Sequence, residues 1–568
     1  MLSLFCLHIT ISFVSLVAGF LFYFLIIRDD RYEKADKYRP AIFYLVTGLV
    51  VLTVITQFFA LFSPVTIFYQ AILLLMLLAF ILPVRKKIIL FLAFIVSEFK
   101  KLPAIVIITG CVTWCLILVL NAGPTLMDDT DSYHIQMVKW IQEYGTVPGL
   151  VNLHERFGFN SSWFSTISLF SFGNQNHNFY TALNAVISLW LAGYLLSLAA
   201  VLLKKNDDGA NKHFPVSYFL VFIMALFSWP ILRGNASTSN YDAIALLMIF
   251  VLFSETYRAS ARLKDFKFPF EWMIWPAFLI TARLTNYPLL LLTLAGFFIL
   301  WGQNEKRKLL LYSFICLITV VPFFIRNLLL SGYPFYPALY FDWFSVDWKA
   351  SKEKTTALLH FIKYYNRVST GIQDLDITEK LSFPDWILFW FKNMLLYNKI
   401  VFVPGIAGFL LFIFRIRRTG FTIRIFFLVI LAQLISWLFT APDPRFVYGC
   451  LFSGIFLLFA SFENYFARMN FKKMYKPAFI VTAILIFAFI INKSITENQY
   501  RNWIYPAALP SPPIKNITIG TIELHIPEKI LNNWNPRCYG TELPCVYKID
   551  SLLEPRGTSI KDGFRLRK

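Results

Sequence analysis

Long runs of hydrophobic residues, separated by short polar stretches, recur along most of the chain. Many of these runs approach the roughly 20 residues that an α-helix needs to cross the hydrocarbon core of a membrane. The first run is too long for a signal peptide and has no basic residues before it, so we expect a retained transmembrane helix. The pattern predicts spans at 2–27, 41–62, 64–84, 104–121, 177–203, 214–232, 241–256, 271–283, 287–301, 309–329, 396–414, 421–440, 446–466 and 477–491.

Lys and Arg residues gather in short stretches between these runs, at 28–39, 85–87, 204–212, 258–267, 306–308, 415–418 and 468–476. Because basic loops remain on the cytoplasmic side of a membrane, this distribution places both termini outside. The outer side then receives 122–176, 233–240, the aromatic-rich loop 331–395 and the tail 493–568. The apolar run 88–96 is too short to span, and we expect it to lie at the membrane interface.

Composition agrees with a membrane protein. Of 568 residues, 57% are hydrophobic and 15% are charged, whereas soluble domains carry about 25% charged residues. The net charge of +20 lies in the short loops, which show no nucleic-acid-binding fold, and we therefore exclude nucleic acid as a partner. The sequence predicts an all-α polytopic membrane protein with N-terminal helices (1–103), a transmembrane core (104–492) with interfacial outer helices, and a small extracytoplasmic appendage (493–568).

Two cysteines, Cys538 and Cys545, lie in a polar loop of the tail that contains Gly and Pro. A short disulfide is expected there if the tail faces an oxidising space. Their spacing is too wide for a CxxC metal site, and no second pair exists.

The run MDDTDSYH places Asp128, Asp129 and Asp131 at the mouth of a membrane span. Carboxylates are costly at such a position unless something uses or solvates them. Asp131 falls at the expected N-cap of the next helix, where a carboxylate accepts backbone N–H groups. That helix is predicted to lie at the interface, since its apolar residues share one face: Tyr133, Met137, Trp140, Ile141 and Tyr144.

An acidic residue four positions before a Tyr, at the start of an interfacial helix in the first large outer loop, resembles the GT-C glycosyltransferases. This superfamily includes protein O-mannosyltransferases and the transferases that add aminoarabinose to lipid A. The resemblance rests on Asp129 to Tyr133 and the turn Gly145 to Gly149. It implies a GT-C-like bundle, a polyprenyl-phosphate-linked sugar donor, and Asp129 in the place of the catalytic aspartate.

The chain departs from that pattern at two points. Thr130 stands where the second acidic residue is expected, and NLHERFGFNSSWF (152–164) replaces the Lys-Pro-Pro pattern. The sequence segments MDDTDSYHIQ, VPGL and FGFNSSWF also resemble a family of multi-pass bacterial membrane proteins of uncharacterised function. The sequence-specific part of the GT-C resemblance covers about twenty residues.

Four arginines lie near predicted outer or buried turns: Arg233, Arg283, Arg326 and Arg445. A phosphate at a membrane interface needs several fixed donors, and the planar guanidinium suits it. Each could instead snorkel or cap a helix. Arg283 is predicted at the buried polar tip of a hairpin formed by 271–283 and 287–301.

Three further polar residues are assigned to the acceptor or loop side of the site: His134, His154 and Arg156. His154 could bind a metal, polarise an acceptor or only solvate a loop. No cofactor is required by this reading, and a divalent metal is left open. No nucleotide-binding or hydrolase motif occurs in the sequence.

The sequence favours a membrane glycosyltransferase of the bacterial inner membrane, active at the periplasmic face. Its partners would be the lipid bilayer, the polyprenyl-phosphate sugar donor and a glycan, lipid or protein acceptor. Two other classes stay open. A surface-polysaccharide polymerase or ligase would depend on outer arginines and histidines more than on Asp129. A transporter or flippase often shows internal symmetry, which we do not detect.

Overall fold

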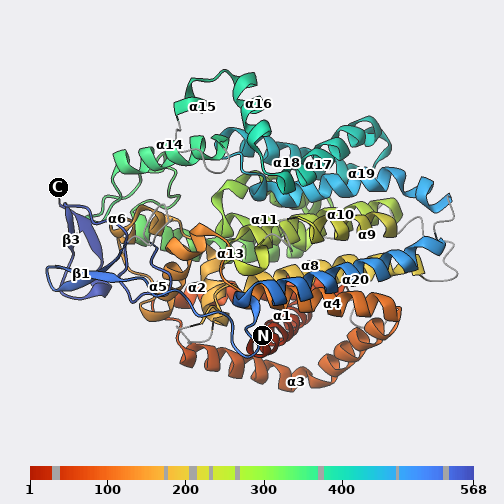
Figure 1. Cartoon of the computed structure of the whole chain (residues 1–568), viewed down its shortest axis with the longest axis horizontal. Helices are drawn as coiled ribbons and strands as arrows, with labels where there is room; N and C mark the ends of the chain where they lie inside the picture. The colour runs from red at the N-terminus through yellow and green to blue at the C-terminus, as the bar shows by residue number, and fades with distance from the viewer. Residues whose placement is uncertain are drawn as a thin grey trace.

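The structure is a computed structural model that describes residues 1–28, 39–171, 177–203, 214–228, 234–262, 269–368, 376–468, 472–528 and 537–567. It is an elongated bundle of helices with little β-structure (Figure 1). Among the described residues, 12 helical segments are long and apolar enough to cross a membrane. The expected class, an all-α polytopic membrane protein, is therefore confirmed.

The helices of the first half are α1 (Leu2–Phe22), α2 (Ala41–Ala60), α3 (Ile67–Lys100), α4 (Ala104–Ala122), α5 (Ile135–Glu143), α6 (Leu150–Leu153), α7 (Ser162–Phe170), α8 (Ala182–Ala199), α9 (Pro215–Leu226) and α10 (Asp242–Arg262). Those of the second half are α11 (Pro269–Ala282), α12 (Leu290–Gly302), α13 (Lys306–Ser331), α14 (Lys352–Val368), α15 (Asp376–Lys380), α16 (Phe383–Asn393), α17 (Leu396–Arg415), α18 (Phe421–Thr440), α19 (Tyr448–Arg468) and α20 (Lys472–Thr496).

Glycines allow two pairs of helices to pack at close range. Gly19 of α1 and Gly48 of α2 lie so near the partner backbone that a Cβ atom at either position would clash with it. Gly408 of α17 and Gly454 of α19 make the same kind of contact. Small residues at such crossings let backbones approach, which is how membrane helices gain packing energy in lipid.

Two helices are too short to cross a membrane: α9, which is shorter than its predicted span at 214–232, and α11, which is about as short as its predicted span at 271–283. Helix α9 has 12 residues and α11 has 14, which corresponds to about 18 and 21 Å at 1.5 Å per residue, less than the roughly 30 Å hydrocarbon core. Residues 270–282 of α11 are all buried. A short helix is tolerated there because it is surrounded by protein and not by lipid.

The run 88–96 is not a separate interfacial segment, as the sequence suggested. It continues α3, a helix of 34 residues with Pro83 inside it. Such a helix is about 51 Å long, so it exceeds the hydrocarbon core. Figure 1 shows α3 curving toward the start of α4, and an internal proline is a common cause of such bending.

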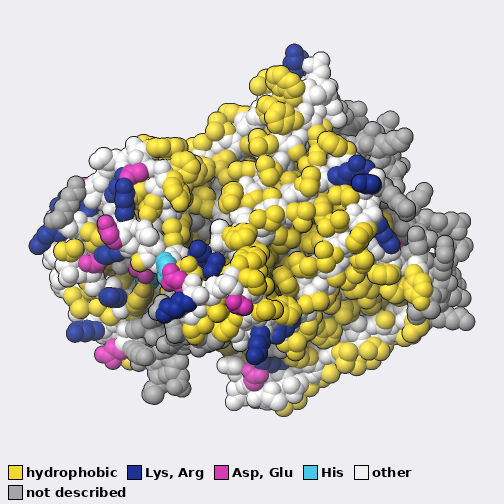
Figure 2. All heavy atoms as spheres, turned by 90° about the horizontal axis from the view of Figure 1, so that it is seen from above, with side chains coloured by type: hydrophobic (Ala, Val, Ile, Leu, Met, Phe, Trp, Pro, Cys, Tyr) yellow, Lys and Arg dark blue, Asp and Glu magenta, His cyan; other side chains and the backbone are white. Residues whose placement is uncertain are grey.

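One end of the bundle carries the segment 127–171 and the described tail residues 498–528 and 537–567, and we call it the tail end. The strands, α5 and α6 all lie there, at the left of Figure 1. In Figure 2, charged side chains gather at this end, whereas hydrophobic side chains cover most of the visible bundle. The ammonium group of Met1 donates to the Asn502 carbonyl over 2.6 Å, so the N-terminus contacts the start of the tail.

The tail folds into two small antiparallel pairs and closes on the bundle. Strand β1 (Ile514–Ile519) pairs with β2 (Ile522–Pro527), and β3 (Leu553–Pro555) pairs with β4 (Phe564–Leu566). The predicted disulfide is present between Cys538 and Cys545. The tail is thus a folded appendage, as the sequence predicted.

Helix α5 is buried, which corrects its expected place at the membrane interface. All residues from Ile135 to Ile141 are buried, including Gln136 and Lys139. The Lys139 ammonium donates to the carbonyls of Gly540 and Thr541 at 2.9 and 2.7 Å. The polar face of α5 is therefore covered by the tail, a contact that helical periodicity cannot reveal.

Candidate active site

The acidic run forms a widened helical turn that leads into α5. Residues Thr130–His134 are π-helical, a form that is rare and frequent at functional sites. The Thr130 hydroxyl accepts a hydrogen bond from the backbone N–H of Ser239 over 3.2 Å. This contact fixes the turn against the segment before α10.

Asp129 lies between two arginines from distant parts of the chain. Its Oδ1 is 3.1 Å from Arg156 Nη1, and its Oδ2 is 3.3 Å from Arg445 Nη2. Arg156 belongs to the 3-10 turn η5 (Glu155–Gly158), and Arg445 to η11 (Pro444–Val447). The Asp129 side chain is 27% exposed, so both ion pairs can be reached from solvent.

The two arginines control the charge of Asp129. Burial alone would raise the pKa of its carboxyl group, but Arg156, Arg445 and the nearby His134 lower it, and the net pKa lies below the ordinary value of 3.8. An opposite charge at this distance favours the ionised form of a carboxylate. Asp129 is therefore fully ionised at neutral pH in the free protein.

Arg445 connects Asp129 to two further carboxylates. Its Nε is 2.9 Å from Asp443 Oδ2 and 3.9 Å from Asp242 Oδ2. Arg283 completes the chain of ion pairs, since its Nη1 lies 2.9 Å from Asp242 Oδ1. We call this set the charged cluster: Asp129, Arg156, Asp242, Arg283, Asp443 and Arg445.

The charged cluster alternates in sign, with three carboxylates and three guanidinium groups. Alternation of this kind lets partly buried charges compensate one another. Arg283 also lies over the ring of Phe446, with its Cζ 3.1 Å from the ring centroid. The charge of Arg283, at the predicted hairpin tip between α11 and α12, is thus compensated by Asp242 and by the aromatic face of Phe446.

Tyrosines lie around the cluster. The Arg156 guanidinium lies 5.7 Å from the ring centroid of Tyr133, and that of Arg283 lies 5.8 Å from the ring centroid of Tyr241. The pKa of Tyr365 on α14 is raised by burial and by Asp129. The outer helix α14 therefore reaches the neighbourhood of the cluster.

His134 faces the interior. Its Nδ1 lies 3.2 Å from the Ser239 hydroxyl, and its ring lies 5.1 Å from that of Phe164, centroid to centroid. Burial lowers the pKa of His134 to about 3. The side chain is therefore neutral at physiological pH.

Asp128 and Asp131 contact the tail and not the cluster. Arg537 places its Nε 2.5 Å from Asp128 Oδ1 and its Nη1 3.6 Å from Asp131 Oδ2. The expected N-cap role of Asp131 is wrong, because the helical turn already begins before it and its Oδ1 accepts a hydrogen bond from the Thr125 hydroxyl at 2.5 Å. Burial raises the pKa of Asp131 to about 6, although Thr125 and Arg537 oppose the shift.

The segment from His154 to Arg156 is also tied to the tail. The His154 ring lies 4.7 Å from that of Tyr547, centroid to centroid, and the Tyr547 hydroxyl donates to Glu155 Oε1 over 3.1 Å. Burial lowers the pKa of His154 to about 4, so this imidazole is neutral as well. Its Nδ1 accepts a hydrogen bond from the backbone N–H of Arg156.

One of the predicted phosphate-binding arginines, Arg326, lies outside the charged cluster. Arg326 is 1% exposed, and its Nη1 donates to Asn160 Oδ1 over 3.0 Å. Its Nε and Nη2 have no hydrogen-bond partner in the described part of the chain. Arg233 lies outside the described residues.

Sequence reasoning missed Asp242, Asp443 and Arg537. Asp242 begins a membrane helix, a place where a carboxylate signals function, and Asp443 stands two residues before Arg445. Those two signals were available in the sequence. Arg537 carried none, because its role depends on how the tail folds back on the bundle.

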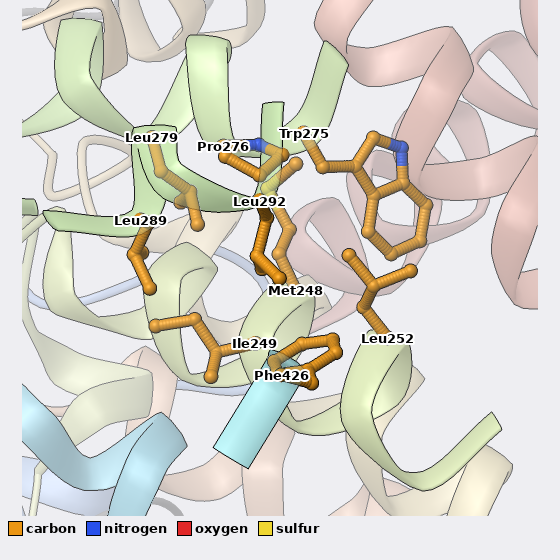
Figure 3. Close-up of a pocket in the computed structure, with 9 residues that line it drawn as sticks. All are labelled: Met248, Ile249, Leu252, Trp275, Pro276, Leu279, Leu289, Leu292 and Phe426. Carbon is orange, nitrogen blue, oxygen red and sulfur yellow. The ribbon is translucent and has the colours of Figure 1, made fainter. Parts of the chain in front are cut away.

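No metal centre is evident within the described ranges. There, no three His, Cys, Asp or Glu side chains are grouped so that they could hold a metal ion. A small pocket between α10, α11, α12 and α18 is lined only by hydrophobic side chains, among them Met248, Trp275 and Phe426 (Figure 3). It contains none of the charged cluster.

Comparison with known proteins gives one family. No curated protein and no solved structure matches the chain. A family model described as a domain of unknown function, DUF8201, matches residues 1–452 and so includes the whole charged cluster. The chain therefore belongs to the DUF8201 family.

Proposed function

We propose that the protein is an integral membrane glycosyltransferase that moves a sugar from a polyprenyl-phosphate donor to an acceptor hydroxyl. The observation that supports this function best is the position of Asp129, a partly exposed carboxylate held between Arg156 and Arg445 at the tail end of a membrane bundle. A base and phosphate-binding groups are the two elements that such a transfer needs.

In the proposed reaction, Asp129 takes the proton of the acceptor hydroxyl as the acceptor oxygen bonds to the anomeric carbon. The bond from that carbon to the phosphate oxygen breaks, and its electron pair remains on the polyprenyl phosphate. Arg156 and Arg445 stabilise the negative charge that grows on this leaving group. A single displacement of this kind inverts the configuration at the anomeric carbon.

The other predicted arginines differ in their freedom to bind the donor. Arg283 is engaged by Asp242, and its proposed role is to hold that carboxylate beside Arg445. Arg326 retains two nitrogens without a partner among the described residues, and its predicted contact with the donor phosphate stays a prediction. Asp128 and Asp131 are proposed to hold the acidic turn in place through Arg537.

We further propose that the protein lies in a bacterial inner membrane with its tail end in the periplasm. The disulfide in the tail is compatible with an oxidising compartment. Lys101 and Lys308 lie beside helix ends that the proposed topology places in the cytoplasm.

A reconstituted assay tests the proposed function. The purified chain would be placed in nanodiscs with polyprenyl-phosphate-linked hexoses or pentoses, together with glycan, lipid and peptide acceptors from bacterial envelopes. Release of polyprenyl phosphate coupled to a mass increase of one acceptor is the expected result. Failure of every donor to react, with donors shown to be intact and inserted, would contradict the proposal.

A further inference from the structure

The resting charged cluster occupies the groups that the reaction needs. Both oxygens of Asp129 face arginines, at 3.1 Å from Arg156 and 3.3 Å from Arg445. A carboxylate held in this way is a weak base, because its proton affinity is lowered by both positive charges. The same two arginines cannot bind a phosphate at full strength while they hold Asp129.

We propose that a phosphate group of the substrate displaces Asp129 from Arg156 and Arg445, so that binding of the anion converts Asp129 into an effective base. This inference rests on the proposed function and adds an order of events to it. The free protein holds the carboxylate in an inactive ion pair, and the substrate releases it.

Charge and geometry favour the exchange. The phosphodiester of the donor carries one negative charge, as Asp129 does, but it can offer oxygens to both arginines. After the sugar has left, the polyprenyl phosphate is a monoester with about −1.5 to −2 charge and three strong acceptor oxygens, so the arginines hold the leaving group more strongly than they hold Asp129. Arg156 has no second carboxylate within 4.0 Å among the described residues, so it is free to transfer to the anion. Arg445 keeps Asp443 at 2.9 Å and Asp242 at 3.9 Å, and these contacts hold it in place during the exchange.

The partners are also accessible. The side chains of Arg156, Arg445 and Asp129 are 26%, 22% and 27% exposed. An anion can therefore approach without unfolding of the bundle. The Asp242 side chain is only 7% exposed, so an incoming anion does not compete with it for its arginine partners.

The sign of the pH effect follows from the groups that surround Asp129. These are Arg156, Arg445, His134, Asp128, Tyr133, Tyr241 and Tyr365. The two arginines depress the pKa of Asp129 in the free protein. Once a phosphate binds both arginines in place of Asp129 and adds its own negative charge nearby, the pKa of Asp129 rises. Binding should therefore take up protons, and more so at pH 6 than at pH 8.

The experiment compares phosphate binding by the wild type and by Asp129→Asn in nanodiscs of neutral lipid. Undecaprenyl phosphate and inorganic phosphate are the two probes, and calorimetry in buffers of different ionisation enthalpy gives both affinity and proton uptake. Asp129→Asn should bind the anion about tenfold more tightly, because it removes the competitor. Arg156→Gln and Arg445→Gln should bind at least tenfold more weakly. The proton uptake that is due to Asp129 is the uptake measured for the wild type minus the uptake measured for Asp129→Asn.

Asp347 provides the matched control. Its Oδ2 also lies between two arginines, 2.9 Å from Arg556 Nε and 3.5 Å from Arg565 Nη1, but outside the charged cluster. Asp347→Asn should leave anion affinity and proton uptake unchanged. A similar gain in phosphate affinity in Asp347→Asn would show a general charge effect and would overturn the proposed displacement of Asp129.

The remaining outcomes are also decisive. Equal or weaker binding by Asp129→Asn would overturn the displacement while leaving the glycosyltransferase proposal to its own assay. Displacement by inorganic phosphate but not by undecaprenyl phosphate would support the exchange and contradict the lipid-linked donor. No binding of either probe by the wild type would overturn both proposals.

Discussion

The hydroxyl of Tyr547 donates a hydrogen bond of 3.1 Å to Glu155, which joins the tail to the residue before Arg156. Because Arg156 in turn holds Asp129, the tail helps to position an arginine of the charged cluster. The family match ends at residue 452, so this support comes from outside the matched region.

The first prediction concerns that contact. Tyr547→Phe keeps the ring against His154 but removes the hydroxyl, and the loss of one hydrogen bond to a charged group costs roughly 1.5–3 kcal/mol. We expect phosphate affinity to fall several-fold while the fold of the bundle is kept. Titration with undecaprenyl phosphate measures the loss. Unchanged affinity would show that Arg156 does not need the tail for its position.

The second prediction concerns Asp131, whose pKa is raised from 3.8 to about 6. A raised carboxyl pKa stabilises the fold fully only below the unfolded-state pKa, and the benefit is lost as pH rises through the folded-state pKa. Asp131→Asn should therefore be more stable than wild type at pH 7.5, by roughly 2–3 kcal/mol, and the difference should vanish near pH 4. Thermal unfolding at both pH values measures it.

Asp128→Asn is the control for that experiment, since Asp128 is on the same turn but is 55% exposed. It should not reproduce the gain in stability at pH 7.5. If Asp131→Asn is less stable than wild type at pH 7.5, the contacts of the Asp131 carboxylate with Thr125 and Arg537 stabilise the fold by more than its burial destabilises it.

The third prediction concerns the disulfide. The Cys538–Cys545 bridge closes the loop whose carbonyls at Tyr539, Gly540 and Thr541 accept from Gln136 and Lys139. Removing a native disulfide typically costs about 2–4 kcal/mol. Reduction should therefore raise hydrogen exchange in residues 537–546 and along α5.

The double variant Cys538→Ser/Cys545→Ser should show the same exchange with or without reductant. Free thiols at both positions in protein that was alkylated under non-reducing conditions would contradict the bridge and the oxidising location of the tail.

The fourth prediction concerns orientation in the membrane. Cysteines introduced at Lys352 and Lys515, both exposed at or near the tail end, should react with a membrane-impermeant maleimide added to intact cells. Cysteines at Lys101 and Lys308 should react only after the cells are opened. The reverse pattern would place the charged cluster in the cytoplasm and remove the periplasmic site.

The membrane class was predictable because it depends on the length of apolar runs, which each segment carries by itself. The hairpin at Arg283 was predictable for the same reason, since a charge between two short apolar runs must be shielded. The sequence could not identify Asp242 as the partner of Arg283, because the contact joins two separate helices.

The failures have a common physical cause. Helix α5 has the periodicity of an interfacial helix, but the tail covers its polar face and satisfies Lys139. Arg156 was assigned to the acceptor side, yet it contacts Asp129 directly. In both cases the deciding contact comes from a segment far along the chain, and no local pattern encodes it.

The most direct test of the account is sugar transfer by Asp129→Asn in the reconstituted assay. Asparagine keeps the size of the side chain but removes its basicity. Protein level and membrane insertion should be retained and donor binding should not weaken, while the transfer rate should fall by at least about two orders of magnitude. Transfer at the wild-type rate by Asp129→Asn would contradict the assignment of Asp129 as the catalytic base.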